Sequence, residues 1–225
     1  MNYELARNFV YRNARPLDIA RWKYLFENGS RKEVLDALTA YQNEDGGFGN
    51  GLEPDYWNPY SSPVQTWTAT EIIKEINLED KNHPIIQGIL NYLSSGKDFD
   101  GHTWSNTVAS NNDYPHAPWW TFESSQETSY IPTAGLIGFV LKFEDNKSKL
   151  FELACDLAKE AYSYFKQHFP LESMHTVACF VELYEYINEC SINGLLDMEE
   201  FGALLNEQIH HVIMYDTSKW AVEYV

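Results

Sequence analysis

Hydrophobic residues recur at helical spacing through most of the chain, in segments separated by loops rich in glycine and proline. The spacing predicts helices over residues 3–13, 16–27, 31–41, 63–76, 83–93, 131–141, 150–165, 171–187 and 201–213. No segment shows the sustained alternation of apolar and polar residues that is typical of a half-buried strand. The sequence therefore predicts an all-α fold.

Two kinds of helix alternate along the chain. The segments 83–93, 150–165 and 201–213 are apolar on one face, whereas 63–76, 131–141 and 171–187 are apolar on more than one. A helix with a single apolar stripe covers one neighbour, and a helix that is apolar all round must itself be surrounded. The alternation predicts two concentric layers of stacked helical hairpins in a single domain, residues 1–225.

The last predicted helix raises a question of completeness. Its apolar stripe needs a partner, yet only residues 220–225 follow it where a helix of the inner kind is expected. We expect either a truncated C-terminus, an open array, or self-association in which another copy covers the unpaired C-terminal hairpin.

Composition narrows the class of protein. The chain is 44% apolar and 15% aromatic, which is typical of a globular domain, and its net charge is −17. This charge argues against binding to nucleic acids and to anionic membrane surfaces, because both depend on Lys and Arg. No apolar run is long enough to span a membrane, and we expect a cytoplasmic protein whose three cysteines are free thiols.

A glycine-rich loop separates the third and fourth predicted helices. Four glycines in six residues are followed by the acidic turn Glu53-Pro54-Asp55. Within it, Gln42-x3-Gly46-x-Phe48 resembles the QW repeat of squalene and oxidosqualene cyclases and of protein prenyltransferase β-subunits. The segment Asp100-Gly101-x2-Trp104 is similar to a degenerate second copy. The resemblance covers about residues 30–190 and implies an (α/α) toroid or partial toroid with a central cavity.

The catalytic motifs of these families are missing. The Asp-x-Asp-Asp motif with which the cyclases protonate an alkene does not occur, and the cysteines lack the Asp-x-Cys arrangement of the prenyltransferase zinc site. The resemblance therefore implies the scaffold without these activities. We expect no cofactor and no metal site, since His210 and His211 have no carboxylate at ligand spacing.

Acidic and aromatic residues of two loops and of the neighbouring helix starts form the predicted ligand site. They are Glu53, Asp55, Trp57, Tyr60, Trp67, Asp113, Tyr114, His116, Trp119, Trp120, Glu123, Glu127, Tyr130 and His175. Carboxylates on a stiff turn could act as acid and base or hold a cation, and aromatic faces bind sugars, prenyl chains and cations. The plainer interpretation is solvated loop acids, an aromatic plug across the ring and a hydrogen-bonded core histidine.

Three functions remain open at this point. The preferred one is the binding of a hydrophobic or cationic small molecule in an acidic, aromatic cavity. The second is a carbohydrate-active (α/α) barrel enzyme that uses paired carboxylates. The third is a structural or interaction module whose cavity is plugged by Trp119 and Trp120.

Overall fold

The computed structural model describes residues 2–124, 129–192, 194–218 and 220. Within them lie nine α-helices, two short 3₁₀ helices and no strand. The elements are α1 (Tyr3–Asn13), α2 (Pro16–Phe26), α3 (Arg31–Thr39), α4 (Pro63–Glu75), α5 (Pro84–Ser94), η1 (Ala109–Asp113), η2 (Pro118–Trp120), α6 (Thr133–Phe143), α7 (Lys149–Gln167), α8 (Met174–Cys190) and α9 (Met198–Val212). The all-α prediction is confirmed, and each predicted helix is present with small shifts at its ends.

Local sequence signals explain where the helices begin. Pro16, Pro63 and Pro84 stand at the first position of α2, α4 and α5, where a missing N–H costs nothing. The side chain of Ser62 caps α4, and that of Ser173 caps α8, each by accepting a hydrogen bond from a free N–H of the first turn. These signals fix the register of the two helices that carry the candidate site.

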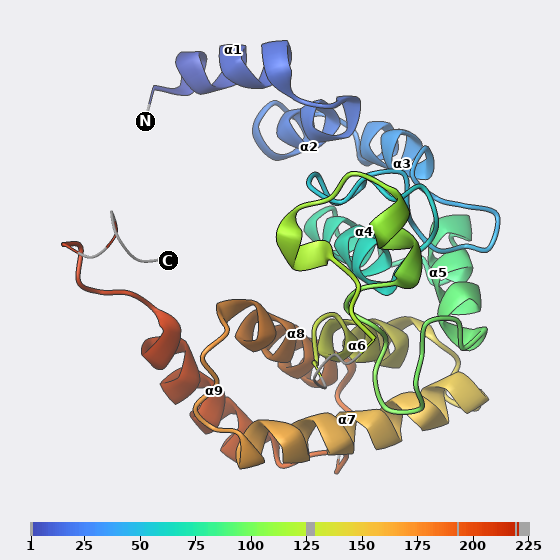
Figure 1. Cartoon of the computed structure of the whole chain (residues 1–225), viewed down its shortest axis with the longest axis vertical. Helices are drawn as coiled ribbons and strands as arrows, with labels where there is room; N and C mark the ends of the chain where they lie inside the picture. The colour runs from blue at the N-terminus through green and yellow to red at the C-terminus, as the bar shows by residue number, and fades with distance from the viewer. Residues whose placement is uncertain (1, 125–128, 193, 219, 221–225) are drawn as a thin grey trace.

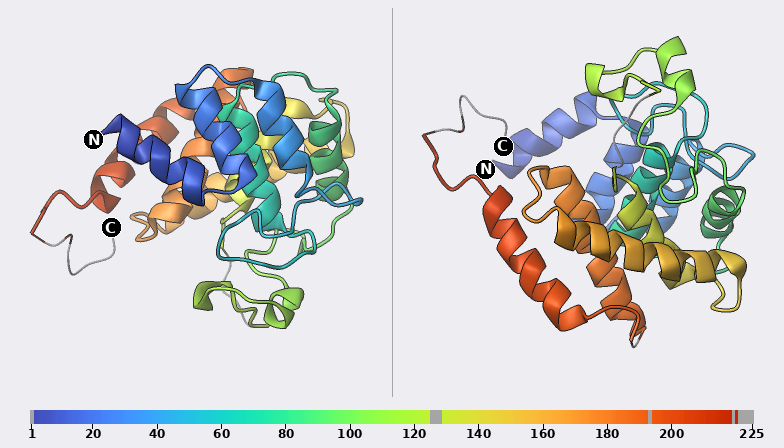
Figure 2. Two further views of the ribbon diagram at one scale, coloured as in Figure 1. Left: turned by 90° about the horizontal axis from the view of Figure 1, so that it is seen from above. Right: turned by 60° about the horizontal axis from the view of Figure 1, so that its bottom comes forward.

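The helices are arranged around α6. Figure 1 shows α3, α5, α7 and α9 following one another around the outside of α4, α6 and α8, and Figure 2 gives two further views of the molecule. In α6 every residue except Lys142 is buried, and its main contacts are with α7 and α8. In α7 the buried residues instead form one stripe. The burial thus follows the alternation seen in the sequence, while the (α/α) toroid stays a prediction.

The glycine-rich loop joins three helices. The Gln42 amide donates hydrogen bonds to the carbonyl oxygens of Gly46 (2.9 Å) and Ile85 (3.3 Å), which ties the loop to the start of α5. Phe48 is fully buried, and its N–H donates to Thr66 Oγ1 of α4 at 3.0 Å. A Cβ atom on Gly46 would lie only 2.1 Å from the carbonyl oxygen of Gly88, so the loop and α5 approach as closely as glycine allows.

Helix α1 depends on a single carboxylate. It has no buried residue of its own, but four donors of α1 and α2 converge on Glu27 at the end of α2. These donors are Tyr3 Oη (3.3 Å), Arg7 Nε (2.8 Å), Tyr11 Oη (2.7 Å) and Trp22 Nε1 (2.9 Å). The hydrogen bonds, that from Tyr11 first, lower the pKa of Glu27 to about 2.

We predict that Glu27→Gln loosens α1 while leaving the rest of the fold intact, because the amide cannot accept from all four donors. The lowered pKa means that the packing of α1 on α2 favours the ionised Glu27 carboxylate. In the native protein, α1 should therefore loosen as the pH falls from about 4 toward about 2. Hydrogen exchange of the amides of residues 3–13 measures both effects. Glu4→Gln removes a charge from α1 itself and serves as control; equal protection in Glu27→Gln and this control would contradict the assignment.

We further predict that Gly46→Ala destabilises the fold more than Gly101→Ala. Both glycines have a positive φ, +87° and +103°, so alanine strains both backbones similarly. Only at Gly46 does the added methyl group meet another backbone, and overpacking of this kind costs about 1–3 kcal/mol. Urea unfolding of the two variants gives the difference, and equal losses would show that the close approach to α5 relaxes without cost.

Candidate functional site

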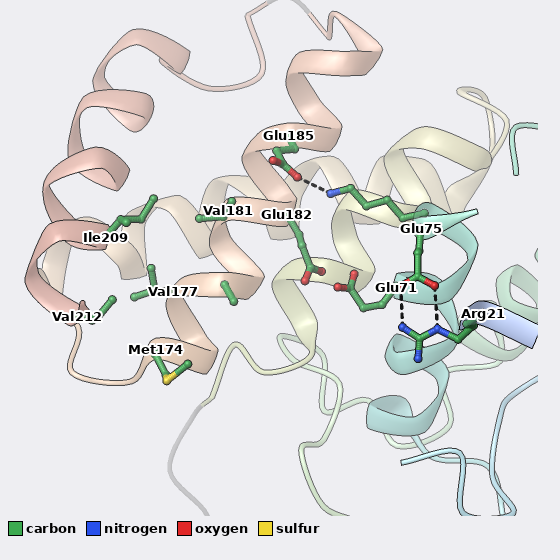
Figure 3. A pocket seen from close by; sticks show the side chains of 12 residues that line it. Arg21, Glu71, Glu75, Met174, Val177, Val181, Glu182, Glu185, Ile209 and Val212 are labelled. Atoms are coloured by element: carbon green, nitrogen blue, oxygen red, sulfur yellow. Dashed lines mark hydrogen bonds and ion pairs between the residues drawn. The ribbon is translucent and has the colours of Figure 1, made fainter. Parts of the chain in front are cut away.

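An open groove of about 610 Å³ lies between α4, α8 and α9, with a side chain of α2 at its edge (Figure 3). Its lining consists of Arg21, Glu71, Lys74, Glu75, Met174, Val177, Ala178, Val181, Glu182, Glu185, Ile209 and Val212. The groove is divided chemically. Figure 3 shows the apolar side chains on α8 and α9 and the charged ones where α8 faces α4 and α2.

Two carboxyl groups face each other across the charged half. Glu71 projects from α4 and Glu182 from α8, and their carboxyl groups point toward each other (Figure 3). The Glu182 side chain is buried, and its Oε2 accepts a hydrogen bond from Trp67 Nε1 at 2.8 Å. The other acceptor, Glu71 Oε1, is buried and has no hydrogen-bond partner among the described residues.

Helix α6 supports the pair from behind. A Cβ atom on Gly135 would lie 2.4 Å from Glu182 Oε2 and 2.6 Å from Trp67 Nε1. Glycine at this position therefore leaves just enough space for the indole and the carboxyl group to meet against the helix backbone. The Glu182 carboxyl group therefore lies against α6, where the indole of Trp67 holds it by a hydrogen bond.

Burial and nearby negative charges raise the pKa values of both members of the pair. Burial, followed by the negative charge of Glu71, raises the pKa of Glu182 to about 8. Burial also raises the pKa of Glu71, and it raises the pKa of the Cys179 thiol on α8, where Glu182 adds to the effect. Glu182 therefore keeps its proton at neutral pH and shares it with Glu71.

The cations of the groove are already engaged. Arg21 Nε and Nη2 donate to the Glu75 carboxylate at 2.8 and 2.7 Å, a two-pronged pair between α2 and α4. Lys74 Nζ pairs with Glu185 Oε2. Four carboxyl groups thus face two cationic side chains, and the groove keeps an excess negative charge even when Glu182 is protonated.

Of the residues predicted from the sequence, only Trp67 reaches this pair. Glu71, Glu182 and the apolar lining were not predicted. The available signal was a carboxyl residue inside each of two helices that are apolar on more than one face, because a charge in such a helix must be paired or shifted in pKa. Their meeting could not be inferred, since Glu71 and Glu182 lie 111 positions apart in the sequence.

A second group of predicted residues meets where the loop after α3 packs on the loop that contains η1 and η2. Trp120 stacks on Tyr56 with ring centroids 5.3 Å apart and donates its Nε1–H to Asp55 Oδ1 at 2.7 Å. Glu53 lies beside Asp55 and accepts a hydrogen bond from Thr68 of α4. Burial, followed by the charge of Asp55, raises the pKa of Glu53.

Other predicted aromatic residues of these loops are more exposed. Trp57 and Trp119 are 64% and 67% exposed, so Trp119 does not act as a plug, whereas its neighbour Trp120 is held between the loops. Tyr60 packs edge-on against Tyr114 at 6.0 Å. The loops therefore present an aromatic surface that is separate from the lining of the groove.

The remaining predicted residues are spread over the molecule. His116 contacts the Tyr114 carbonyl oxygen (2.6 Å) and Thr121 Oγ1 (3.1 Å), and Asp113 and Glu123 are exposed. Tyr130 is buried against Tyr164 and Phe180, and burial raises its pKa to about 12. His175 is exposed at the second position of α8, and Glu127 lies outside the described residues.

Two further findings concern the same described part of the chain. We find no helix there with the length and apolarity needed to cross a bilayer. Nor do these residues bring together three His, Cys, Asp or Glu side chains that could hold a metal ion. Comparisons with protein-family models, with curated proteins and with solved structures found no match to this chain.

We predict that Glu182→Gln reduces the pH dependence of stability between about pH 5 and pH 8. An unfolded glutamate loses its proton near pH 4.3, whereas folded Glu182 keeps it until about pH 8. The folded protein therefore binds the extra proton in this window, and its free energy of unfolding falls as the pH rises. Glutamine has the shape of the protonated acid but does not titrate.

Urea unfolding at pH 5, 6.5 and 8 tests this prediction. The matched control is Glu189→Gln, which removes a carboxylate from the exposed side of α8, where it pairs with Lys142. The control should keep the pH dependence of the wild type. An unchanged dependence in Glu182→Gln would show that Glu182 does not hold the proton.

Proposed function

We propose that the protein binds a small amphipathic molecule with a cationic head in the groove between α4, α8 and α9. The observation that carries this proposal is the Glu71–Glu182 pair beside an apolar wall, with Glu182 buried and Glu71 partly buried. Buried carboxyl groups attract a cation strongly because little water screens them, and they keep it only if the rest of the ligand is also accommodated. Val177, Val181 and Ile209 offer the apolar surface for that part.

The scaffold we propose is a partial (α/α) toroid of the kind found in terpenoid cyclases and protein prenyltransferases. Its support is the QW-like loop at Gln42–Phe48, which joins α3, α4 and α5, and the order of inner and outer helices. The groove then corresponds to the side of the inner helices that faces the middle of the ring. A cytoplasmic location belongs to the same proposal.

The geometry gives little support to a carbohydrate-active enzyme. A glycoside hydrolase needs its two carboxyl groups about 5–9.5 Å apart to leave room for the glycosidic bond and, in inverting enzymes, a water molecule. In the Glu71–Glu182 and Glu53–Asp55 pairs the two carboxyl groups lie close enough to act on each other's pKa directly. Neither pair leaves that space.

The exposed aromatic surface of the two loops favours an interaction module as the second candidate. Trp57, Tyr60 and Trp119 are each more than half exposed. Aromatic side chains of this kind often anchor protein partners. This surface is separate from the groove, and both functions can be present in one chain.

We predict that the double variant Glu71→Gln, Glu182→Gln binds octyltrimethylammonium and octylamine at least about tenfold more weakly than the wild type, because it removes both carboxyl groups from the groove. Isothermal titration calorimetry measures the affinities. Glu189→Gln, on the same helix but outside the groove, should bind as the wild type does. Equal affinity in the double variant, or no binding of either cation by the wild type at millimolar concentration, would contradict the proposed function.

A further inference from the structure

The Glu71–Glu182 pair has room to accept one more hydrogen bond. Glu71 Oε1 is buried without a partner among the described residues, although a carboxylate oxygen in such surroundings is normally hydrogen-bonded. Glu182 Oε2 is fixed by Trp67 and by the backbone of Gly135. The pair can therefore accept a donor from the groove without first rearranging.

Nothing within the groove supplies that donor. Arg21 is engaged by Glu75 and Lys74 by Glu185, each on a neighbouring face of α4. A divalent cation is disfavoured as well, because Ca²⁺ and Mg²⁺ take six or more oxygen ligands and the described residues gather no third acidic or histidine ligand here. A ligand in the groove can supply the donor.

We propose that this donor is the protonated primary or secondary amine of an alkylamine-type ligand, and that the ammonium group replaces the proton shared by Glu71 and Glu182. This inference rests on the proposed function and names the ligand class for the same groove. The ammonium group brings at least two N–H donors and one positive charge, so it can satisfy Glu71 Oε1 and the Glu182 carboxylate together. The alkyl part lies against Val177, Val181 and Ile209.

The exchange balances in charge and protons. The protonated amine enters with its own proton and its positive charge, and Glu182 loses one proton to the solvent. The total charge of the groove is unchanged, and no covalent bond other than O–H is broken. Two carboxylates then flank one ammonium group and accept charge-assisted hydrogen bonds from it.

The charged and titratable neighbours of the pair set its pH dependence. They are Lys74 and Glu75 on α4, Cys179, Glu185 and Tyr186 on α8, and Arg21 on α2. The α6 side of the pair presents Gly135, which has no titratable group. Binding of the amine should therefore strengthen as Glu182 gives up its proton, by up to tenfold per pH unit below about pH 8, and level off above it.

A quaternary ammonium group separates this inference from the proposed function. Octyltrimethylammonium carries the same charge and a similar chain as octylamine, but it has no N–H donor and its three methyl groups keep the nitrogen away from the carboxyl oxygens. It should bind in the groove beside the two carboxyl groups, more weakly than octylamine, and it should not displace the proton of Glu182. Octanol and octanoate control for the apolar chain and for an anionic head.

Titration calorimetry of the whole chain at pH 7, in buffers that differ in ionisation enthalpy, measures the protons released. We expect octylamine to bind with release of nearly one proton and at least about tenfold more tightly than octyltrimethylammonium. Glu182→Gln, which keeps the shape of the protonated acid, should bind octylamine more weakly and release none. Glu189→Gln should match the wild type in both respects.

The alternative outcomes are distinct. Octylamine binding without proton release, or equal affinity for the two cations, overturns the proton exchange while leaving the cationic groove in place. Binding of octanol as tight as that of octylamine shows an apolar site only and overturns the exchange. Failure of both cations to bind overturns the proposed function itself.

Discussion

The close approach of α8 to α6 is the constraint on which the rest of this structure depends. Gly135 and Gly138 stand three residues apart on α6, and at each of them a Cβ atom would lie 2.4 Å from a side-chain atom of α8. Small residues at this spacing let one helix lie directly on another, which explains why α6 and α8 share the most extensive contact in the described part of the chain. Because α8 lies so close, Glu182 reaches across α6 to Trp67 and Glu71 of α4.

This packing also accounts for the unusual chemistry of the groove. A glutamate on an exposed helix face keeps its contact with water, and Glu189 of α8 is such a residue, paired with Lys142. Glu182 lies on another face of α8, where α4 and α6 enclose it. Its carboxyl group loses its hydration there and keeps a proton. Shared protons between buried carboxyl groups are costly for stability, and such groups are often found at functional sites.

The two loops that hold most of the predicted residues have a different physical character. The loop after α3 acts as a joint, because Gln42, Gly46 and Phe48 connect it to the starts of α4 and α5. Its acidic end is tied to the η1–η2 loop by the hydrogen bond from Trp120 to Asp55. Glu53 and Asp55 are therefore largely engaged in holding the loops together, and the aromatic residues around them form an outer surface.

The sequence by itself determined the helices, their order and their kind. Capping residues, prolines and the spacing of apolar residues are local signals, and they placed α4, α6 and α8 as the helices that are apolar on more than one face. The loop motif at Gln42–Phe48 was likewise visible in the sequence, whereas its contacts with α4 and α5 appear only in the structure.

Only the tertiary structure decided where the chemistry lies. Trp67 was expected at a ligand site. Its partner Glu182 lies 115 positions further along the chain, and no local pattern links the two residues. The pKa of a carboxyl group depends on which atoms surround it in space, and the surroundings of Glu182 come from α4, α6 and α8 together. The spacing of apolar residues in the sequence shows where a helix forms. The burial and pairing of its carboxyl groups depend on how helices that are distant in the sequence pack together.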